Sequence, residues 1–210
     1  MLSASSAPPP ASGLLYLHGF NSAGASPKAR LVQQACQSLG LACLVPDLPH
    51  HAEEALDLAE SLLDSLGPRP VLMGSSMGGF LSTVLAERHG LPAVLVNPAV
   101  RPARLVKTML GQGFINAYTG ERFSVEQSHY DQIVAMTPER VDPQHYLLLL
   151  VTQDETLDSA DAFNFYRGAR MVLHPGGEHG FDRLADYLPA AFAHAGYTLV
   201  PGSIAPVMKE

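Results

Sequence analysis

A glycine–serine motif between an apolar run and a helical pattern constrains the fold more than any other stretch of this sequence. The apolar run ends in Gly74-Ser75-Ser76-Met77-Gly78, and a helical pattern follows over residues 81–88. G-x-S-x-G in this context is the spacing of a nucleophile elbow, in which the flanking glycines let a strand and a helix cross without side-chain collision. The motif predicts Ser76 as a nucleophile, with the backbone N–H of Met77 at the helix start facing the bond it attacks. An ordinary glycine-rich turn is the alternative, because the motif is short.

Short apolar runs alternate with amphipathic helical patterns along most of the chain. Uninterrupted apolar runs are typical of strands buried on both faces, and their alternation with helices indicates βαβ units. We therefore predict an α/β fold with a mostly parallel sheet of about six strands flanked by helices. The expected strands are 13–17, 41–45, 70–73, 93–96, 145–151 and 170–173, and the expected helices are 27–39, 52–66, 81–88, 159–167 and 188–194. Pro189 is expected in the first turn of the last helix, because proline breaks a helix interior.

The alternation stops over residues 103–143, where no strand-like run is expected and apolar residues are scattered among polar ones. A segment of that length in a compact domain commonly forms a lid or a binding cap, and we call it the insertion. The expected organisation is a disordered lead-in over 1–12, a single domain over 13–198 that includes the insertion, and a C-terminal tail over 199–210.

Composition limits the partners that a chain of 210 residues can have. A net charge of −7 without a lysine-rich block argues against binding to a nucleic-acid backbone. The longest apolar runs have strand length, and residues 1–12 lack the regions of a secretory signal. Cys36 and Cys43 lie among apolar neighbours, so free thiols in a reducing compartment are expected rather than a disulfide. These features predict a cytoplasmic protein that binds neither a membrane nor a nucleic acid.

A serine nucleophile needs a general base and an orienting carboxylate, and two loops after later strands can supply them. His179 lies in a glycine-rich loop after the strand at 170–173, whereas His174 at the strand end is expected to be structural. Asp154 is the first carboxylate after the strand at 145–151. Asp158 resembles a helix N-cap, and Glu155 is the third choice. The order Ser76, Asp154, His179 is the chain order of the nucleophile-elbow architecture.

The loop after the first strand is expected to complete the oxyanion hole. Gly19 would let the backbone approach, so that the N–H of Phe20 and the N–H of Met77 face the same oxygen. No phosphate loop and no dinucleotide fingerprint is present, so no cofactor is expected. A metal site is also not expected, because no two of the nine histidines show H-x-x-x-H spacing. His50 and His51 would point apart on a regular helix or strand.

Several stretches together resemble the small bacterial α/β-hydrolases of the YqiA/YcfP-like esterase type, the UPF0227 group. The resemblance covers nearly all of the folded part, and its most specific stretch is 96–102. The matching stretches are Leu15-Tyr16-Leu17-His18-Gly19-Phe20-Asn21-Ser22, Gly74-Ser75-Ser76-Met77-Gly78-Gly79, Val96-Asn97-Pro98-Ala99-Val100-Arg101-Pro102, Tyr118-Thr119-Gly120, Asp154-Glu155-Thr156-Leu157-Asp158 and Gly176-Gly177-Glu178-His179-Gly180-Phe181.

The resemblance implies an α/β-hydrolase fold and a carboxylesterase-like activity on short acyl esters, with thioesters as a further substrate class. It also implies that Ser76, Asp154 and His179 form the catalytic triad. The chain departs from the family pattern at Gln153, where a glycine is expected before the acid, and in its two extended ends. Asn97 has no role that the residues define, and Arg101 is expected to pair with a carboxylate of the insertion rather than with an anionic substrate.

These observations predict a serine hydrolase that forms an acyl-enzyme, releases it with water and needs no cofactor. The apolar insertion would line the acyl pocket. An acyl-CoA thioesterase or acyltransferase is the nearer alternative, because it differs only in the leaving group or the acceptor. A hydrolase fold kept as a non-catalytic binding module is the second alternative, because fold does not determine function.

Overall fold

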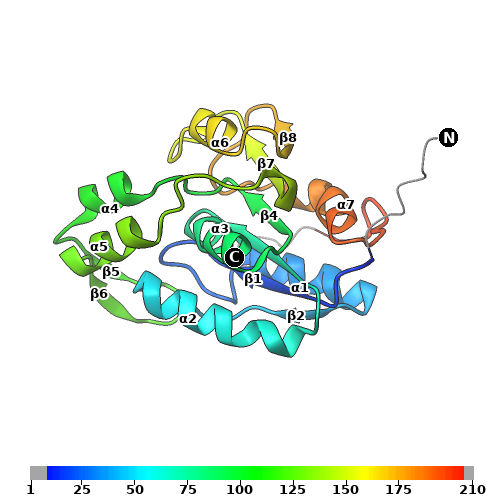
Figure 1. Ribbon diagram of the computed structural model, residues 1–210, viewed down its shortest axis with the longest axis horizontal. Helices are drawn as coiled ribbons and strands as arrows, with labels where there is room; N and C mark the ends of the chain where they lie inside the picture. The colour runs from blue at the N-terminus through cyan, green and yellow to red at the C-terminus, as the bar shows by residue number, and fades with distance from the viewer. Residues whose placement is uncertain (1–8, 206–210) are drawn as a thin grey trace.

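The computed structural model describes residues 9–205 and shows one parallel sheet between two layers of helices (Figure 1). The sheet has six strands in the order β2-β1-β3-β4-β7-β8, and every neighbouring pair is parallel. The strands are β1 (Gly13–Leu17), β2 (Ala42–Leu44), β3 (Pro70–Ser75), β4 (Ala93–Val96), β7 (Tyr146–Val151) and β8 (Arg170–His174). The predicted fold class is therefore confirmed.

Seven α-helices occur within residues 9–205, and five of them flank the sheet. They are α1 (Pro27–Leu39), α2 (Ala52–Leu63), α3 (Met77–His89), α6 (Ser159–Phe165) and α7 (Leu184–His194); α4 (Ala103–Met109) and α5 (Gln127–Met136) belong to the insertion. One hydrophobic core lies between the sheet and the pair α1 and α7, and the other lies between the sheet and α2, α3 and α6. Because both faces are covered, β1, β3, β4 and β7 are buried at every position, as their apolar sequences predict.

Helix boundaries follow the local signals closely at α1 and poorly at α7. Helix α1 begins with Ser26 as N-cap and Pro27 in its first turn, and it ends at Gly40 in a left-handed conformation, as predicted. Helix α7 begins at Leu184, four residues earlier than expected, so Pro189 lies inside the helix. The prediction that Pro189 occupies the first turn is wrong, because backbone bonds such as Leu184 N–H to Phe181 O start the helical path earlier.

The insertion contains a small hairpin that the sequence analysis did not predict. Strands β5 (Gly113–Ile115) and β6 (Arg122–Ser124) pair antiparallel, and the side chain of Asn116 accepts hydrogen bonds from the Tyr118 and Thr119 amides in the turn between them. Strands of three residues are too short to produce a visible apolar run. Together α4, β5, β6 and α5 gather at one end of the molecule, on the left in Figure 1.

The two ends of the domain are more firmly packed than expected. Residues 1–8 and 206–210 lie outside the described residues, so most of the predicted lead-in and part of the predicted tail are not described. Within the described part, the amide of Ala11 donates to Ala195 O and the amide of Ser12 donates to Arg69 O, so these two residues belong to the domain. Leu199, expected to open the tail, is buried as well.

The remaining expectations from composition concern thiols and membranes. Cys36 is buried and Cys43 is half-buried, and both are free thiols. Between residues 9 and 205, no helix combines the length and the apolar character that crossing a membrane requires.

Candidate active site

Ser76 occupies a strained turn between β3 and α3. Its backbone has φ 55° and ψ −120°, which an L-residue adopts only when the surroundings enforce it. A Cβ at Gly74 would lie 2.2 Å from Gly78 O, and a Cβ at Gly78 would lie 2.0 Å from Leu17 O. Both distances are shorter than any real contact, so this strand–helix crossing requires glycine at both positions, as the motif predicts.

The structure brings Ser76, His179 and Asp154 into one hydrogen-bonded chain. His179 Nε2 lies 2.9 Å from Ser76 Oγ, and His179 Nδ1 lies 2.8 Å from Asp154 Oδ2. A carboxylate can only accept, so Nδ1 carries the proton and Nε2 is left to accept the serine hydroxyl hydrogen. The three residues come from loops after β3, β7 and β8, whose carboxyl ends meet at one edge of the sheet.

The side chain of Asp154 is buried and is kept in its charged carboxylate form by hydrogen bonds. Its side chain is only 2% exposed, and its Oδ1 accepts the backbone N–H groups of Thr156 at 2.9 Å and Leu157 at 2.8 Å. Burial alone would raise the pKa of Asp154, but the bonds from His179 and from these two amides outweigh it, so the pKa lies below its usual value. Asp154 therefore stays charged at neutral pH and fixes the His179 ring.

The other candidates in these two loops have supporting positions. Glu155 accepts the backbone N–H of His179 at 2.9 Å, and this bond lowers the pKa of Glu155. Asp158 caps α6 by accepting the Ala160 amide, as predicted. His174 ends β8 and bonds the hydroxyl of Tyr187 at 2.8 Å, in agreement with the structural place expected for it.

The two loops are also tied to each other, despite Gln153 at the position where glycine was expected. The hydroxyl of Thr152 accepts the Gly176 amide at 2.8 Å, and Gly176 O accepts the Thr152 and Gln153 amides at 3.1 and 3.3 Å. The acid loop and the histidine loop therefore form one unit at the sheet edge.

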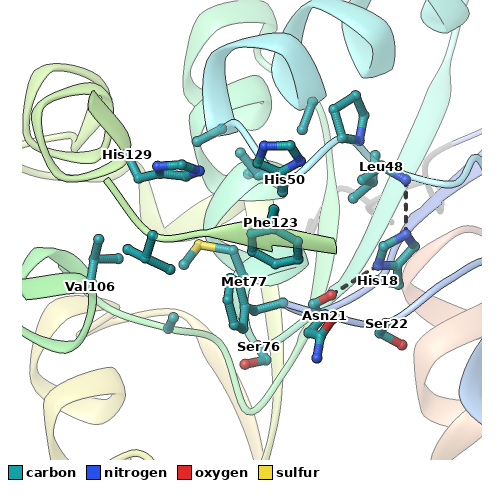
Figure 2. A pocket seen from close by; sticks show the side chains of 18 of the residues that line it. His18, Asn21, Ser22, Leu48, His50, Ser76, Met77, Val106, Phe123 and His129 are labelled. Atoms are coloured by element: carbon teal, nitrogen blue, oxygen red, sulfur yellow. Dashed lines mark hydrogen bonds between the residues drawn. The ribbon is translucent and has the colours of Figure 1, made fainter. Parts of the chain in front are cut away.

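The loop after β1 passes directly against the serine. A Cβ at Gly19 would lie 3.3 Å from Ser76 Cβ, which is tighter than most Cβ contacts, so a side chain here would press on the serine. His18 fixes this loop: its Nε2 accepts the Leu48 amide at 2.9 Å, which leaves Nδ1–H to donate to Gly19 O (Figure 2). Phe20 follows in this loop, and Met77 is the first residue of α3, where an N–H group has no acceptor within the helix.

Asn97 is a structural member of the site that sequence reasoning left without a role. It is 3% exposed, its Oδ1 accepts the Val151 amide at 3.0 Å, and its Nδ2 donates to His179 O at 3.1 Å. The side chain thereby links the end of β7 to the loop that carries His179. A signal was available, because asparagine directly after a buried strand is one of the residues that tolerate positive φ, and Asn97 has φ 40°.

Arg101 does not pair with a carboxylate of the insertion, so that expectation is wrong. Its guanidinium donates to the backbone carbonyl of Glu139 at 3.3 Å and lies over the ring of Phe165. The main chain of the insertion, rather than a side-chain charge, is therefore its partner.

Positive φ values mark the sheet edge as a whole. The non-glycine residues with positive φ among residues 9–205 are Asn21, Ser76, Asn97, Arg101 and Phe181, and each follows a strand of the sheet at its carboxyl end. Strained backbone gathers where a fold positions functional groups, so this edge is the candidate site on conformational grounds as well.

A cavity opens beside Ser76 and extends under the insertion. It encloses about 910 Å³ of space, including open solvent at its mouth, and Ser76 and Met77 line it. The insertion contributes apolar walls such as Val106, Phe123 and Ile133. In the view of Figure 2, Met77 and Phe123 lie between Ser76 and two histidines, His50 and His129.

His50 and His51 do not point apart, so that expectation is wrong. Their ring centroids lie 4.7 Å apart, and both rings stack near His129 of α5. Side chains of neighbouring residues diverge in a regular helix or strand, but His50 and His51 lie at the bend that leads into α2. The divergence expected of neighbouring side chains therefore does not exclude a metal site at this pair.

Comparison with solved structures shows the α/β-hydrolase fold. The chain matches alpha/beta hydrolase domain-containing protein 10 from mouse with a TM-score of 0.62 and 18% identity, over 80% of this chain and 82% of that one. It matches the monoacylglycerol lipase of Paleococcus ferrophilus with a TM-score of 0.60 and 19% identity, over 79% and 85% of the two chains. Est1E from Butyrivibrio proteoclasticus gives a TM-score of 0.63 and 18% identity, over 90% and 87%.

A family model covers most of the chain. The model described as "Uncharacterised protein family (UPF0227)" matches residues 13–196, which include every strand of the sheet and all three members of the hydrogen-bonded chain. This is the family whose resemblance the motifs indicated. The chain belongs to the UPF0227 family.

Proposed function

We propose that this protein is a serine hydrolase that cleaves short-chain acyl esters through an acyl-enzyme. One observation carries the proposal: the hydrogen-bonded chain from Asp154 through His179 to Ser76, which ends at the wall of an apolar cavity. A non-catalytic module would not need this chain of contacts. The free cysteines favour action in the cytoplasm.

The proposed first half-reaction transfers the acyl group to the enzyme. Ser76 Oγ attacks the ester carbonyl while His179 Nε2 takes the hydroxyl proton, and Asp154 stabilises the imidazolium that forms. His179 then gives this proton to the departing alkoxide, so the alcohol leaves and Ser76 carries the acyl group. In the second half, His179 takes a proton from water, the hydroxide attacks the acyl carbon, and the carboxylic acid leaves as Ser76 regains its proton.

The developing negative charge is proposed to be held by two backbone donors. The N–H of Met77 lies at the N-terminus of α3, where the helix dipole favours negative charge. The loop of Gly19 and Phe20 lies on the other side of Ser76 and would provide the second N–H. Loss of one such donor typically reduces kcat by about 10²- to 10³-fold.

The acyl chain is proposed to enter the cavity beneath the insertion. Its wall is mostly apolar, with Val106, Phe123 and Ile133 on the insertion side. Structurally similar proteins include a monoacylglycerol lipase and Est1E, which was determined with ferulic acid bound, and a lipase is consistent with ester substrates. A thioester would place the same carbonyl on Ser76, so acyl-CoA thioesterase or acyltransferase activity remains the alternative to compare.

Labelling with a fluorophosphonate, followed by intact-mass analysis, tests the proposal. We expect one adduct on the parent protein, none on Ser76→Ala and slow formation on His179→Ala. Ser61→Ala, which removes an exposed serine hydroxyl of α2, serves as the matched control and should label like the parent. Ser76→Ala should also lower kcat for a 4-nitrophenyl ester by about 10⁶-fold.

The opposite result has a definite meaning. If the parent shows no adduct under conditions that label a known esterase, Ser76 is not activated and the protein is a binding module. If the adduct forms, the ratio of kcat/KM for an acyl-CoA to that for the matching simple ester separates a thioesterase from an esterase.

A further inference from the structure

Three histidines from two separate segments meet at the wall of the cavity. His50 and His51 precede α2, and His129 lies in the first turn of α5 in the insertion. One ring nitrogen of each lies within 4.8 Å of a ring nitrogen of each of the others. We call these residues the histidine cluster. In Figure 2, His50 and His129 lie on the same side of Met77 and Phe123, with Ser76 on the other side.

Two nitrogens of the histidine cluster are buried without a partner. His51 Nδ1 and His129 Nε2 have essentially no accessible area and no hydrogen bond, and His129 as a residue is 6% exposed. A buried polar atom without a partner is destabilising, and in native proteins such atoms usually have a protein group, a water or an ion as their partner. Two of them in one cluster point to a ligand that they would share.

The third histidine is already oriented. His50 Nδ1 lies 2.9 Å from Glu121 Oε1, so Nδ1–H donates to the carboxylate and the lone pair of Nε2 is free. A histidine whose second nitrogen is held by a carboxylate is the usual arrangement around a bound metal. Glu121 lies beside β6, so the insertion supplies this orienting group as well.

We propose that His50, His51 and His129 form a site for a divalent transition metal, with Zn²⁺ as the matching ion. Imidazole nitrogen suits Zn²⁺, Cu²⁺ and Ni²⁺, whereas Mg²⁺ and Ca²⁺ prefer oxygen. Three protein ligands leave a fourth position on a tetrahedral ion. Since His50 and His129 line the cavity, that position would face the cavity and take a water or an oxygen of a bound molecule.

Binding requires two local changes. His129 Nδ1 accepts the Glu126 amide at 3.0 Å, so the proton of the neutral ring is on Nε2 and must move to Nδ1, with loss of this one hydrogen bond. The rings of His51 and His129 stack at 4.0 Å, and a lone pair lies in the ring plane, so the His51 ring must turn toward the ion. Because His51 Nδ1 has no partner and the residue is only half-buried, turning the ring breaks no bond at that atom.

The pKa of His129 is compatible with metal binding at the site that the geometry defines. Burial, together with the nearby rings of His51 and His50, lowers the pKa of His129, so this ring is neutral at neutral pH. Neutral imidazole is the form that coordinates a metal. The free energy of binding a transition metal is much larger than the contribution of a single capping hydrogen bond. Losing the hydrogen bond from the Glu126 amide therefore does not prevent binding.

A metal here would join the insertion to the body of the domain. His129 and the orienting Glu121 belong to the insertion, whereas His50 and His51 belong to the body. The site shares no residue with the chain of Ser76, His179 and Asp154, so it stands whether or not the proposed hydrolase activity does. Its binding can be measured without any substrate.

Titration of the chelator-treated protein with Zn²⁺ and with Co²⁺ tests the proposal. We expect one equivalent of Zn²⁺ to bind and to raise Tm, and Co²⁺ to give the strong visible absorption of a tetrahedral site. His51→Ala and His129→Gln should each weaken binding by more than about 100-fold, because each removes a ligand. Glu121→Gln should weaken it by about 10- to 100-fold, the usual range for a group that orients a ligand.

His89→Ala is the matched control. His89 bonds the carboxylate of Glu60 at the surface, outside the cavity, so its loss should leave the affinity unchanged. Circular dichroism shows whether His129→Gln has folded. His51 is only half-buried, so His51→Ala tests the same site with a smaller disturbance of the fold. Absence of stoichiometric binding by the parent protein would overturn the proposal, and so would an affinity in both ligand variants equal to that of the parent. Binding lost in His51→Ala but kept in folded His129→Gln would reduce the site to the neighbouring pair and overturn it as well.

Discussion

The sheet edge around Ser76 and the histidine cluster both border one cavity and both contain imidazoles, but their polar atoms differ in whether they have partners. At the sheet edge, both ring nitrogens of His179 have partners, and its backbone N–H and C=O are bonded as well. In the histidine cluster, His51 Nδ1 and His129 Nε2 are buried with none. The first region satisfies its polar atoms within the protein, whereas the second leaves two ring nitrogens for the proposed metal.

The difference follows from how each region is built. Parallel strands hold the ends of β3, β7 and β8 at one edge, so three short loops meet there whatever else the chain does. The histidine cluster forms only when α5 of the insertion packs against the start of α2. The sheet edge should therefore respond to mutation with large losses of rate, and the insertion with smaller changes of stability and affinity.

Among the substitutions that compare the two regions, the largest effect is expected from Asp154→Asn. The amide cannot keep the proton of His179 on Nδ1, so the base would present the wrong tautomer to Ser76, and kcat should fall about 10⁴-fold with the fold intact. Steady-state hydrolysis of a 4-nitrophenyl ester measures this.

Glu155→Gln is the control for that change. Glu155 also contacts His179, but through its backbone N–H, and an amide oxygen can still accept that bond. A fall in kcat of less than about 10-fold is expected. Equal losses in the two variants would contradict the assignment of Asp154 as the orienting acid.

Glycine substitutions compare the packing of the two regions. At Gly78 a Cβ would lie 2.0 Å from Leu17 O, so Gly78→Ala must separate α3 from β1 and should cost about 3 kcal/mol of stability. At Gly113 in the insertion hairpin the nearest atom would be 3.9 Å away, and Gly113→Ala should change stability by no more than about 0.5 kcal/mol. Urea unfolding measures both. A mild effect at Gly78 would mean that the strand–helix crossing is less rigid than the contacts indicate.

Sequence reasoning located the sheet edge because its signals are local. The turn at Ser76 needs glycines at fixed spacing, and apolar strands followed by Asp154 and His179 place both side chains at the same edge. The choice of Asp154 followed from its place as the first carboxylate after the strand and from the resemblance of Asp158 to a helix N-cap. Asp154 is the one of the three carboxylates that contacts a ring nitrogen of His179.

What the sequence did not indicate depends on contacts between distant segments. No sequence signal near His50 and His51 predicts their contact with His129, because the three rings meet only through packing of the insertion. The β5–β6 hairpin is stabilised by the side chain of Asn116 and by the cross-strand pair of Phe114 and Phe123, and neither produces an apolar run in the sequence. The start of α7 was placed too late for a related reason. The helix begins before Pro189, in a loop whose turn has no strong residue signal.

Two buried asparagines give the finest comparison of the regions. Asn97 at the sheet edge and Asn116 in the insertion are 3% and 7% exposed, and each bonds backbone groups through both ends of its amide. Asn97→Ala would leave the Val151 amide and His179 O without partners, so stability should fall by about 2–4 kcal/mol. Because His179 is then less well positioned, kcat should fall about 10-fold with little change in KM.

Asn116→Ala should instead act through the wall of the cavity. Its Nδ2 donates to Ser22 O at 2.7 Å, a bond that joins the insertion to the loop after β1. Loss of this bond should lower stability by about 1–3 kcal/mol and raise KM, while kcat changes little, because no bond to His179 is lost.

Asn97→Asp separates the positioning of His179 from the packing of residue 97. Its carboxylate oxygen can still accept from the Val151 amide, but nothing donates to His179 O, so kcat should fall while most of the side-chain shape is kept. If Asn97→Ala changed KM and Asn116→Ala changed kcat, the histidine loop would not depend on Asn97, and the division between a rigid reacting edge and an adaptable wall would be wrong.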